Sequence, residues 1–98
     1  MIDEIRFSWD KKKAQSNMRK HGISFDEALS VFDDIHARLM LDPDHSQEEE
    51  RFILLGLSQA SRILTVVHCY RDEKDNIRII SARKSTKTEQ KQYKEYLI

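Results

Sequence analysis

The sequence is poor in the residues that build disulfides and phosphate-binding loops. Its 98 residues include one cysteine, one proline and two glycines. Cys69 has no second cysteine to pair with, so it cannot form an internal disulfide, which favours a reducing compartment. Gly22 and Gly56 do not form the glycine-rich loop that cradles a phosphate.

The sequence also lacks a metal-binding motif. The four histidines are scattered, and with a single cysteine they do not have the spacing of a zinc site. They are His21, His36, His45 and His68. We therefore expect neither a metal nor a cofactor. A Ser-His-Asp signature is also absent, although such triads have no fixed sequence spacing.

Long hydrophobic runs are missing as well. No apolar stretch approaches the ~20 residues that a helix needs to span a bilayer. The opening residues, 1–4, do not begin a positively charged and then apolar signal peptide. We therefore expect a cytoplasmic protein with no membrane contact. The length fits one domain over residues 1–98, and the hydrophobic fraction of 39% is patterned enough to argue against disorder.

The net charge of zero conceals a segregation of charge along the chain. Residues 1–23 carry six basic and three acidic residues, whereas residues 24–50 carry one basic and nine acidic residues. Residues 51–98 carry ten basic and five acidic residues. This pattern indicates one basic surface, suited to phosphates, and one acidic surface. The acidic stretch could meet a basic partner or could simply be solvated.

Local signals in the first third predict a strand and two helices. Residues 5–9 alternate apolar and polar side chains as a short strand does. Asp10 can cap a helix over residues 11–21, and Gly22 suits the left-handed residue that follows a helix. Ser24 and Glu27 can form the capping box of the next helix. An apolar stripe then predicts its core face: Phe25, Ala28, Leu29 and Phe32.

The remaining residues predict four strands and a last helix. The strands are expected over 36–41, 51–57, 62–70 and 77–82, and the helix over 87–97. Pro43 places a turn after the first of these strands, and Thr86 with Glu89 can make a capping box. The order is β-α-α-β-β-β-β-α. We expect an α+β fold with an antiparallel sheet and the helices packed on one face.

A basic cluster near the C-terminus is the first candidate site. Its members are Arg78, Arg83, Lys84, Lys87, Lys91 and Lys94. Alternation places Arg78 on the sheet face opposite Ile77 and Ile79, and Arg83 lies just past the strand end. An arginine there can bind a phosphate with two parallel hydrogen bonds and stabilise charge on phosphorus. A solvated basic face is the competing interpretation.

Four other positions have both structural and functional interpretations. His68, in mid-strand, could act as a general acid or base or could be a hydrogen-bonded structural histidine. Lysines in the first turn of the first helix oppose the helix dipole, which can mark function or only a solvated turn. His45 is a surface residue or a loop anchor. Tyr93 suits core packing or, less directly, contact with RNA.

Three stretches together resemble the BrnT family of toxins across nearly the whole chain. The first runs from Phe7-Ser8-Trp9-Asp10 through Lys13, Asn17 and Lys20 to His21-Gly22-Ile23-Ser24-Phe25. The second is Glu27-Ala28 with Val31-Phe32-Asp33-Asp34. The third is Ile77-Arg78-Ile79-Ile80-Ser81-Ala82-Arg83 with Glu89 and Tyr93, and between them lie Asp42, His45, Glu49, Arg51, Gly56 and Arg62.

The resemblance implies a RelE-like fold and RNA cleavage that arrests growth. It also implies a partner, a BrnA-like antitoxin with a ribbon-helix-helix DNA-binding part. Contact with operator DNA would then run only through that antitoxin.

Our hypothesis for the site is metal-independent RNA cleavage by attack of the 2′-OH on the adjacent phosphate. Arg51, Arg78 and Arg83 would hold and stabilise the phosphate. A general base and acid would come from among His68, Glu89 and Tyr93. The expected RNA-binding lysines are Lys11, Lys12, Lys13, Lys84, Lys87 and Lys91. The alternatives are a catalytically inactive co-repressor that acts with its antitoxin, and a ribosome-binding inhibitor that cuts nothing.

Overall fold

The computed structural model describes residues 5–44, 49–71 and 75–97, so His45 lies outside the described residues. Its elements follow the expected order, with one added 3₁₀ turn, η1. They are β1 (Arg6–Ser8), α1 (Lys11–His21), α2 (Phe25–Ser30), η1 (Val31–Asp33), β2 (Arg38–Leu41), β3 (Phe52–Leu57), β4 (Ile63–Arg71), β5 (Asn76–Lys84) and α3 (Lys87–Glu95). The α+β class and the element order predicted from the sequence are confirmed.

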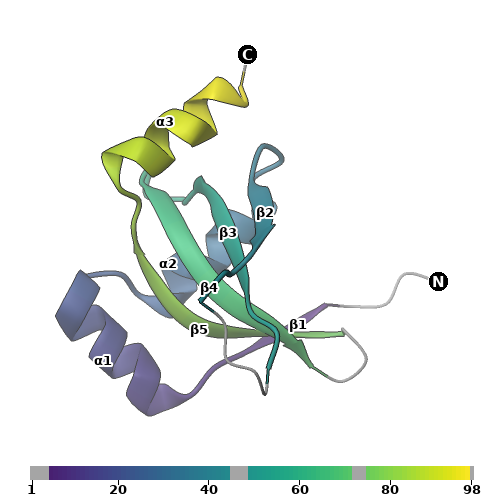
Figure 1. Cartoon of the computed structure of the whole chain (residues 1–98). Coiled ribbons are helices and arrows are strands. Elements are labelled where there is room, and N and C mark those ends of the chain that lie inside the picture. Colours follow the sequence, from purple (N-terminus) through teal and green to yellow (C-terminus); the bar gives the residue numbers. More distant parts are fainter. Residues whose placement is uncertain (1–4, 45–48, 72–74, 98) are drawn as a thin grey trace.

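The five strands form one sheet in the order β1-β5-β4-β3-β2 (Figure 1). Strands β2 to β5 make the expected antiparallel meander. The expectation of a wholly antiparallel sheet is wrong at one pair, because β1 lies parallel to β5 with Phe7 opposite Ile77. Parallel neighbours need a long crossover, and the chain between β1 and β5 contains every other strand.

The hydrophobic core lies on the sheet face covered by α1 and α2. Phe25 and Ala28 of α2 are buried there, as the apolar stripe predicted, whereas Leu29 and Phe32 are half-buried. The buried cluster consists of Ile23, Phe25, Ala28, Val31, Leu54, Leu64, Val66, Ile77, Ile79 and Ala82. Figure 1 shows α2 behind the sheet and α1 beside β5.

Helix α3 contacts the other face, which corrects the expectation that all helices pack on one side. Four strand residues lie directly opposite one another in a row across the sheet: Arg38, Leu55, Thr65 and Arg83. Their neighbours Leu54, Val66 and Ala82 belong to the core, so the row faces away from it. Glu89 of α3 bonds both Thr65 and Arg83, and Tyr96 lies under the Arg38 guanidinium at 3.7 Å.

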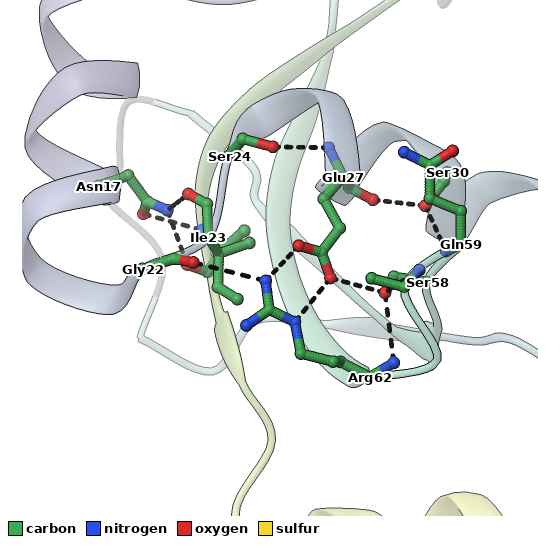
Figure 2. Close-up of polar contacts among 11 residues, drawn as sticks. Asn17, Gly22, Ile23, Ser24, Glu27, Ser30, Ser58, Gln59 and Arg62 are labelled. Atoms are coloured by element: carbon green, nitrogen blue, oxygen red, sulfur yellow. Dashed lines mark hydrogen bonds and ion pairs between the residues drawn. The ribbon is translucent and has the colours of Figure 1, made fainter.

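Both ends of α1 lie where the sequence predicted them. The Asp10 side chain accepts hydrogen bonds from the backbone N–H groups of Lys12 and Lys13, and Gly22 has a φ of 68°. Asn17 of α1 then reaches the outer edge of β5, where its amide bonds both the N–H and the C=O of Ala82. It also donates to the Ile23 carbonyl (Figure 2). One buried side chain therefore joins α1, the following turn and the sheet.

The start of α2 confirms half of its predicted capping box. Ser24 accepts a hydrogen bond from the Glu27 backbone N–H, as expected. The Glu27 side chain does not return to Ser24. It accepts two hydrogen bonds from Arg62 and one of 2.7 Å from the Ser58 hydroxyl (Figure 2). An ion pair with a residue 35 positions later has displaced the local bond.

Candidate nucleic-acid interface

Two arginines of β5, Arg78 and Arg83, lie on the same face of the sheet because the strand contains a bulge. Strict alternation would place residues 78 and 83 on opposite faces. The register shifts between Val67 and His68, which pair with Ser81 and Ile79, and Ile80 is left without a partner residue. One extra residue reverses the alternation beyond it. Arg78, opposite Cys69, and Arg83, opposite Thr65, therefore both face away from the core.

Arg51 joins them by strand alternation, since the adjacent Phe52 packs with His68 on the core side. Its Nε lies 3.7 Å from a Glu49 oxygen, and within the described residues this buried nitrogen makes no hydrogen bond. The three predicted arginines thus share a face but not one point. The partners of Arg78 and Arg83 on β4, Cys69 and Thr65, are four residues apart, so the two arginines are separated by about 13 Å along the strand. This separation suits two phosphates of a bound strand better than one phosphate.

Arg83 is held firmly by Glu89. Two nearly parallel hydrogen bonds of 2.8 and 3.0 Å join the guanidinium to the carboxylate. The carboxylate also accepts bonds from the Thr65 hydroxyl and the Thr86 backbone N–H, which completes the predicted capping box of α3. The Arg83 guanidinium, more than the other donors, lowers the pKa of Glu89 to about 2. Glu89 thereby orients Arg83 and fixes the helix start.

Arg78 differs from Arg83 in having no such partner. Its side chain is half-buried and, across the described segments, takes part in no hydrogen bond or ion pair. Together with the Lys12 and Lys13 backbone bonds, its positive charge contributes to lowering the pKa of Asp10. An arginine without a carboxylate partner can offer its whole planar fork of N–H groups to a phosphate. Arg78 is therefore the arginine of this face that is best prepared for an anionic ligand.

His68 does not belong to this face. Its side chain is fully buried on the core side, where the rings of Phe32, Phe52 and Tyr70 surround it. Burial lowers its pKa, so the imidazole stays neutral. A residue with no exposed surface cannot reach RNA bound on the opposite side of the sheet. The structural interpretation of His68 therefore fits its surroundings.

Tyr93 is also occupied elsewhere. Its side chain is buried, and its hydroxyl donates a 2.6 Å hydrogen bond to Asp34 at the end of η1. Burial, and then the Asp34 carboxylate that accepts this bond, raise the pKa of Tyr93 to about 12. A phenol that holds its proton so tightly and donates it to an internal acceptor is ill suited to proton transfer with a substrate.

The expected RNA-binding lysines divide between two regions. Lys13 lines a shallow depression between α1 and β5, and Lys11 and Lys12 are exposed in the same helical turn. Lys84 lies on the other side of the sheet from Arg83, close enough to lower the pKa of Glu27 slightly beside the main contribution of Arg62. Lys87 and Lys91 are exposed on α3. Of these six lysines, Lys13 lines the depression beside β5.

The other residues that line this depression were not predicted as site residues from the sequence. They are Ser16, Asn17, Lys20, His21, Ile80 and Ser81. A signal existed, because residues 13, 16, 17 and 20 have the i, i+3, i+4, i+7 spacing of one helix face. That spacing is usually read for apolar stripes, whereas here the face is polar and basic.

The described residues contain no group of three or more His, Cys, Asp or Glu side chains placed to hold a metal ion. No helix among them has both the length and the apolar character needed to cross a membrane.

The chain matches a known protein family over most of its length. A family described as "Ribonuclease toxin, BrnT, of type II toxin-antitoxin system" matches residues 9–89. The chain belongs to the BrnT family. No curated protein sequence gave a match.

A solved structure shares the fold. The crystal structure of the Brucella abortus ribonuclease toxin BrnT superposes with a TM-score of 0.63 at 21% sequence identity. The match covers 85% of this chain and 99% of that one. It agrees with the α+β architecture that the resemblance in the sequence implied.

Proposed function

We propose that this BrnT-family chain is an endoribonuclease that cleaves RNA by attack of a 2′-OH on the adjacent phosphate. The observation that carries the proposal is the shared face of Arg78 and Arg83, which only the bulge in β5 brings together. Figure 1 shows α3 over one end of the sheet. An RNA strand along β5 would meet Arg78 first and the Arg83–Glu89 pair next.

The arginines supply binding and electrostatic stabilisation. Negative charge builds up on the phosphate oxygens in the transition state, and fixed guanidinium donors stabilise it more than the ground state. Arg78 can offer this to the scissile phosphate, while Arg83, held by Glu89, binds a neighbouring one. Arg51 extends the positive surface onto β3, and the α1 lysines add long-range attraction. The products would be a 2′,3′-cyclic phosphate and a 5′-hydroxyl.

The proton-transfer group is not among the three candidates chosen from the sequence. His68 is fully buried on the other face, Glu89 is bound to Arg83, and Tyr93 donates to Asp34. In this proposal all three have structural or positioning roles.

The test is cleavage of a 5′-labelled RNA by purified protein, with EDTA present. Wild type should leave 2′,3′-cyclic phosphate ends. Arg78→Ala should lose at least 100-fold in rate while remaining folded, since no hydrogen bond or ion pair within the described residues depends on this side chain. Arg19→Ala, which removes the same charge from exposed α1, is the matched control and should cleave normally. Equal rates for Arg78→Ala and Arg19→Ala would contradict the proposed site.

Growth arrest and an antitoxin partner complete the proposal. Type II toxins act with an antitoxin, and we propose a BrnA-like ribbon-helix-helix protein that neutralises the chain in the cytoplasm and provides its only contact with operator DNA. Induced expression should arrest growth with fragmented RNA, and co-expression of the neighbouring antitoxin should restore growth. Arrest with intact RNA would favour a ribosome-binding inhibitor. Neither arrest nor fragments would favour a catalytically inactive co-repressor.

A further inference from the structure

A shallow depression of about 180 Å³ lies between α1 and the outer edge of β5. Its lining residues are Lys13, Ser16, Asn17, Lys20 and His21 from α1, and Ile80 and Ser81 from β5. Three of these side chains are basic types and none is acidic. The lining therefore favours an anion with hydrogen-bonding groups, such as a ribose phosphate.

The depression exists because β5 extends beyond the end of its parallel neighbour, β1. Strand β1 pairs with β5 only as far as Ser8 opposite Arg78, so the edge of β5 beyond that point has no strand beside it. Helix α1 occupies the space, and Asn17 fixes the distance through its two bonds to Ala82. The bulge at Ile80 lies in this same stretch. The walls are thus held by buried hydrogen bonds rather than by flexible side chains.

The position along β5 links the depression to the arginine face. Ile80 and Ser81, which line it, lie in sequence between Arg78 and Arg83 on a single strand. An RNA strand that contacts both arginines therefore spans the stretch of β5 whose edge forms one wall of the depression. His21, the last residue of α1, is exposed there.

His21 has the right chemistry in the right place. Imidazole is the side chain that ordinarily exchanges protons near neutral pH. The other exposed histidine of the described residues, His36, follows the acidic pair Asp33 and Asp34 and interacts with Asp34. That surface would repel a phosphate, whereas the neighbours of His21 attract one.

We propose that this depression receives the ribose and phosphate at the cleavage point, and that His21 is the general base of the reaction. The inference rests on the proposed function. Neutral His21 takes the proton of the 2′-OH as its oxygen bonds to phosphorus and the bond from phosphorus to the 5′ oxygen breaks. The 5′ oxygen takes a proton from solvent, and the imidazolium then releases its proton to solvent. Lys13 and Lys20 bind the phosphate oxygens.

The experiment compares His21→Gln with His36→Gln, each against wild type, from pH 5 to pH 9. The charged side chains that line the depression with His21 are Lys13 and Lys20 of α1. The β5 residues there, Ile80 and Ser81, do not titrate. We expect His21→Gln to lower kcat at least 100-fold, the usual contribution of general-base catalysis, and to flatten the acid limb of the pH profile. His36→Gln should match wild type throughout.

Binding is measured separately with uncleavable 2′-O-methyl RNA. His21→Gln should bind it within twofold of wild type, whereas Lys13→Ala should bind more weakly with a smaller salt dependence. In wild type, this RNA should shift the imidazole NMR signals of His21 and not those of His36. An unchanged kcat and pH profile for His21→Gln would overturn the inference and leave the proposed function standing. RNA binding without a His21 shift would place the substrate elsewhere, and a wild type that cleaves no RNA would overturn both.

Discussion

Tyr93 donates a 2.6 Å hydrogen bond to Asp34, which fastens α3 to the turn that follows α2. Asp34 also accepts bonds from the backbone N–H groups of Leu57 and His36. Burial alone would raise the pKa of Asp34, but these three donors together hold it below its ordinary value. The carboxylate therefore joins three separate segments: η1, the end of β3 and α3.

Removal of the Tyr93 hydroxyl should destabilise the protein measurably. A hydrogen bond to a charged group contributes about 1.5–3 kcal/mol, so Tyr93→Phe should lower the free energy of unfolding by about that amount in urea. The matched control is Tyr96→Phe, because Tyr96 is 58% exposed and keeps its ring beside Arg38. It should change stability by less than about 0.5 kcal/mol. Equal effects of the two changes would contradict this role for the hydroxyl.

The stability should fall steeply in acid because of Glu89. Its pKa in the folded protein, about 2, lies below its ordinary value of 4.5, so the ionised form stabilises the fold. That contribution is complete above pH 4.5 and is lost progressively as the pH falls toward 2. Glu89→Gln lacks the titrating group. The thermal unfolding temperature should therefore fall less between pH 6 and pH 2 in Glu89→Gln than in wild type. An equal fall in both proteins would contradict this role of the Glu89 carboxylate.

Glu89→Gln also separates a positioning role from proton transfer. If Glu89 only orients Arg83, the amide retains a hydrogen bond to Arg83 and cleavage should fall less than tenfold, with the pH profile unchanged. A general base would lose about 100-fold or more. Single-turnover cleavage at several pH values distinguishes the two, and a loss of that larger size would return Glu89 to the catalytic candidates.

The pair Glu27–Arg62 should respond unequally to removal of its two partners. The Glu27 side chain is only 9% exposed, whereas that of Arg62 is 34% exposed. Arg62→Ala leaves a buried carboxylate with Ser58 as its remaining side-chain donor, so it should destabilise the fold clearly. Glu27→Ala leaves an arginine that water can reach, so it should destabilise the fold less. Urea denaturation at pH 7 measures both.

The pH dependence provides an independent check on Arg62→Ala. The hydrogen bonds from Arg62 are the main cause of the lowered pKa of Glu27. Without them burial raises that pKa, and a raised folded pKa favours the fold at lower pH. The stability deficit of Arg62→Ala should therefore shrink between pH 7 and pH 5, and a deficit that grows would contradict this account.

Gly56 should accept no larger residue because three side chains of the stretch 31–37 lie close to its Cα. A Cβ there would lie 2.8 Å from Val31 Cγ1, 2.9 Å from Ala37 Cβ and 3.0 Å from Asp34 Oδ2. Gly56→Ala should cost about 1–3 kcal/mol through overpacking. Since the Val31 methyl is the nearest atom, the double variant Gly56→Ala/Val31→Ala should cost less than the sum of the two single changes. Strict additivity would point to a cause other than this contact.

Local signals explain why much of the fold was predictable from the sequence. The bounds of α1 follow from Asp10 and Gly22, whose roles depend only on neighbouring backbone groups. The strand segments and their meander follow from alternation and short turns. Glu27 shows the limit, because its cap was predicted from local spacing, while the structure gives its carboxylate to Arg62, a partner far along the chain.

The candidate site was harder to predict from the sequence, because it also depends on contacts between residues far apart in the chain. The bulge that brings Arg78 and Arg83 to one face arises from pairing between strands, and no residue type in β5 predicts it. The buried state of His68 depends on which aromatic rings surround it, and that is a tertiary property. Residue type alone singled out the arginines of this face, and it gave three proton-transfer candidates whose side chains are engaged in internal contacts.

The two edges of the sheet differ in what they can accept. Along the outer half of β5, the Asn17 amide already satisfies the N–H and C=O of Ala82 as a neighbouring strand would. At the opposite edge, no strand of the described residues lies beyond β2, and its Leu39 and Leu41 are 54% and 52% exposed. An extra strand, from a second copy or another protein, would have to displace Asn17 along the outer half of β5, whereas at β2 it would meet exposed apolar side chains.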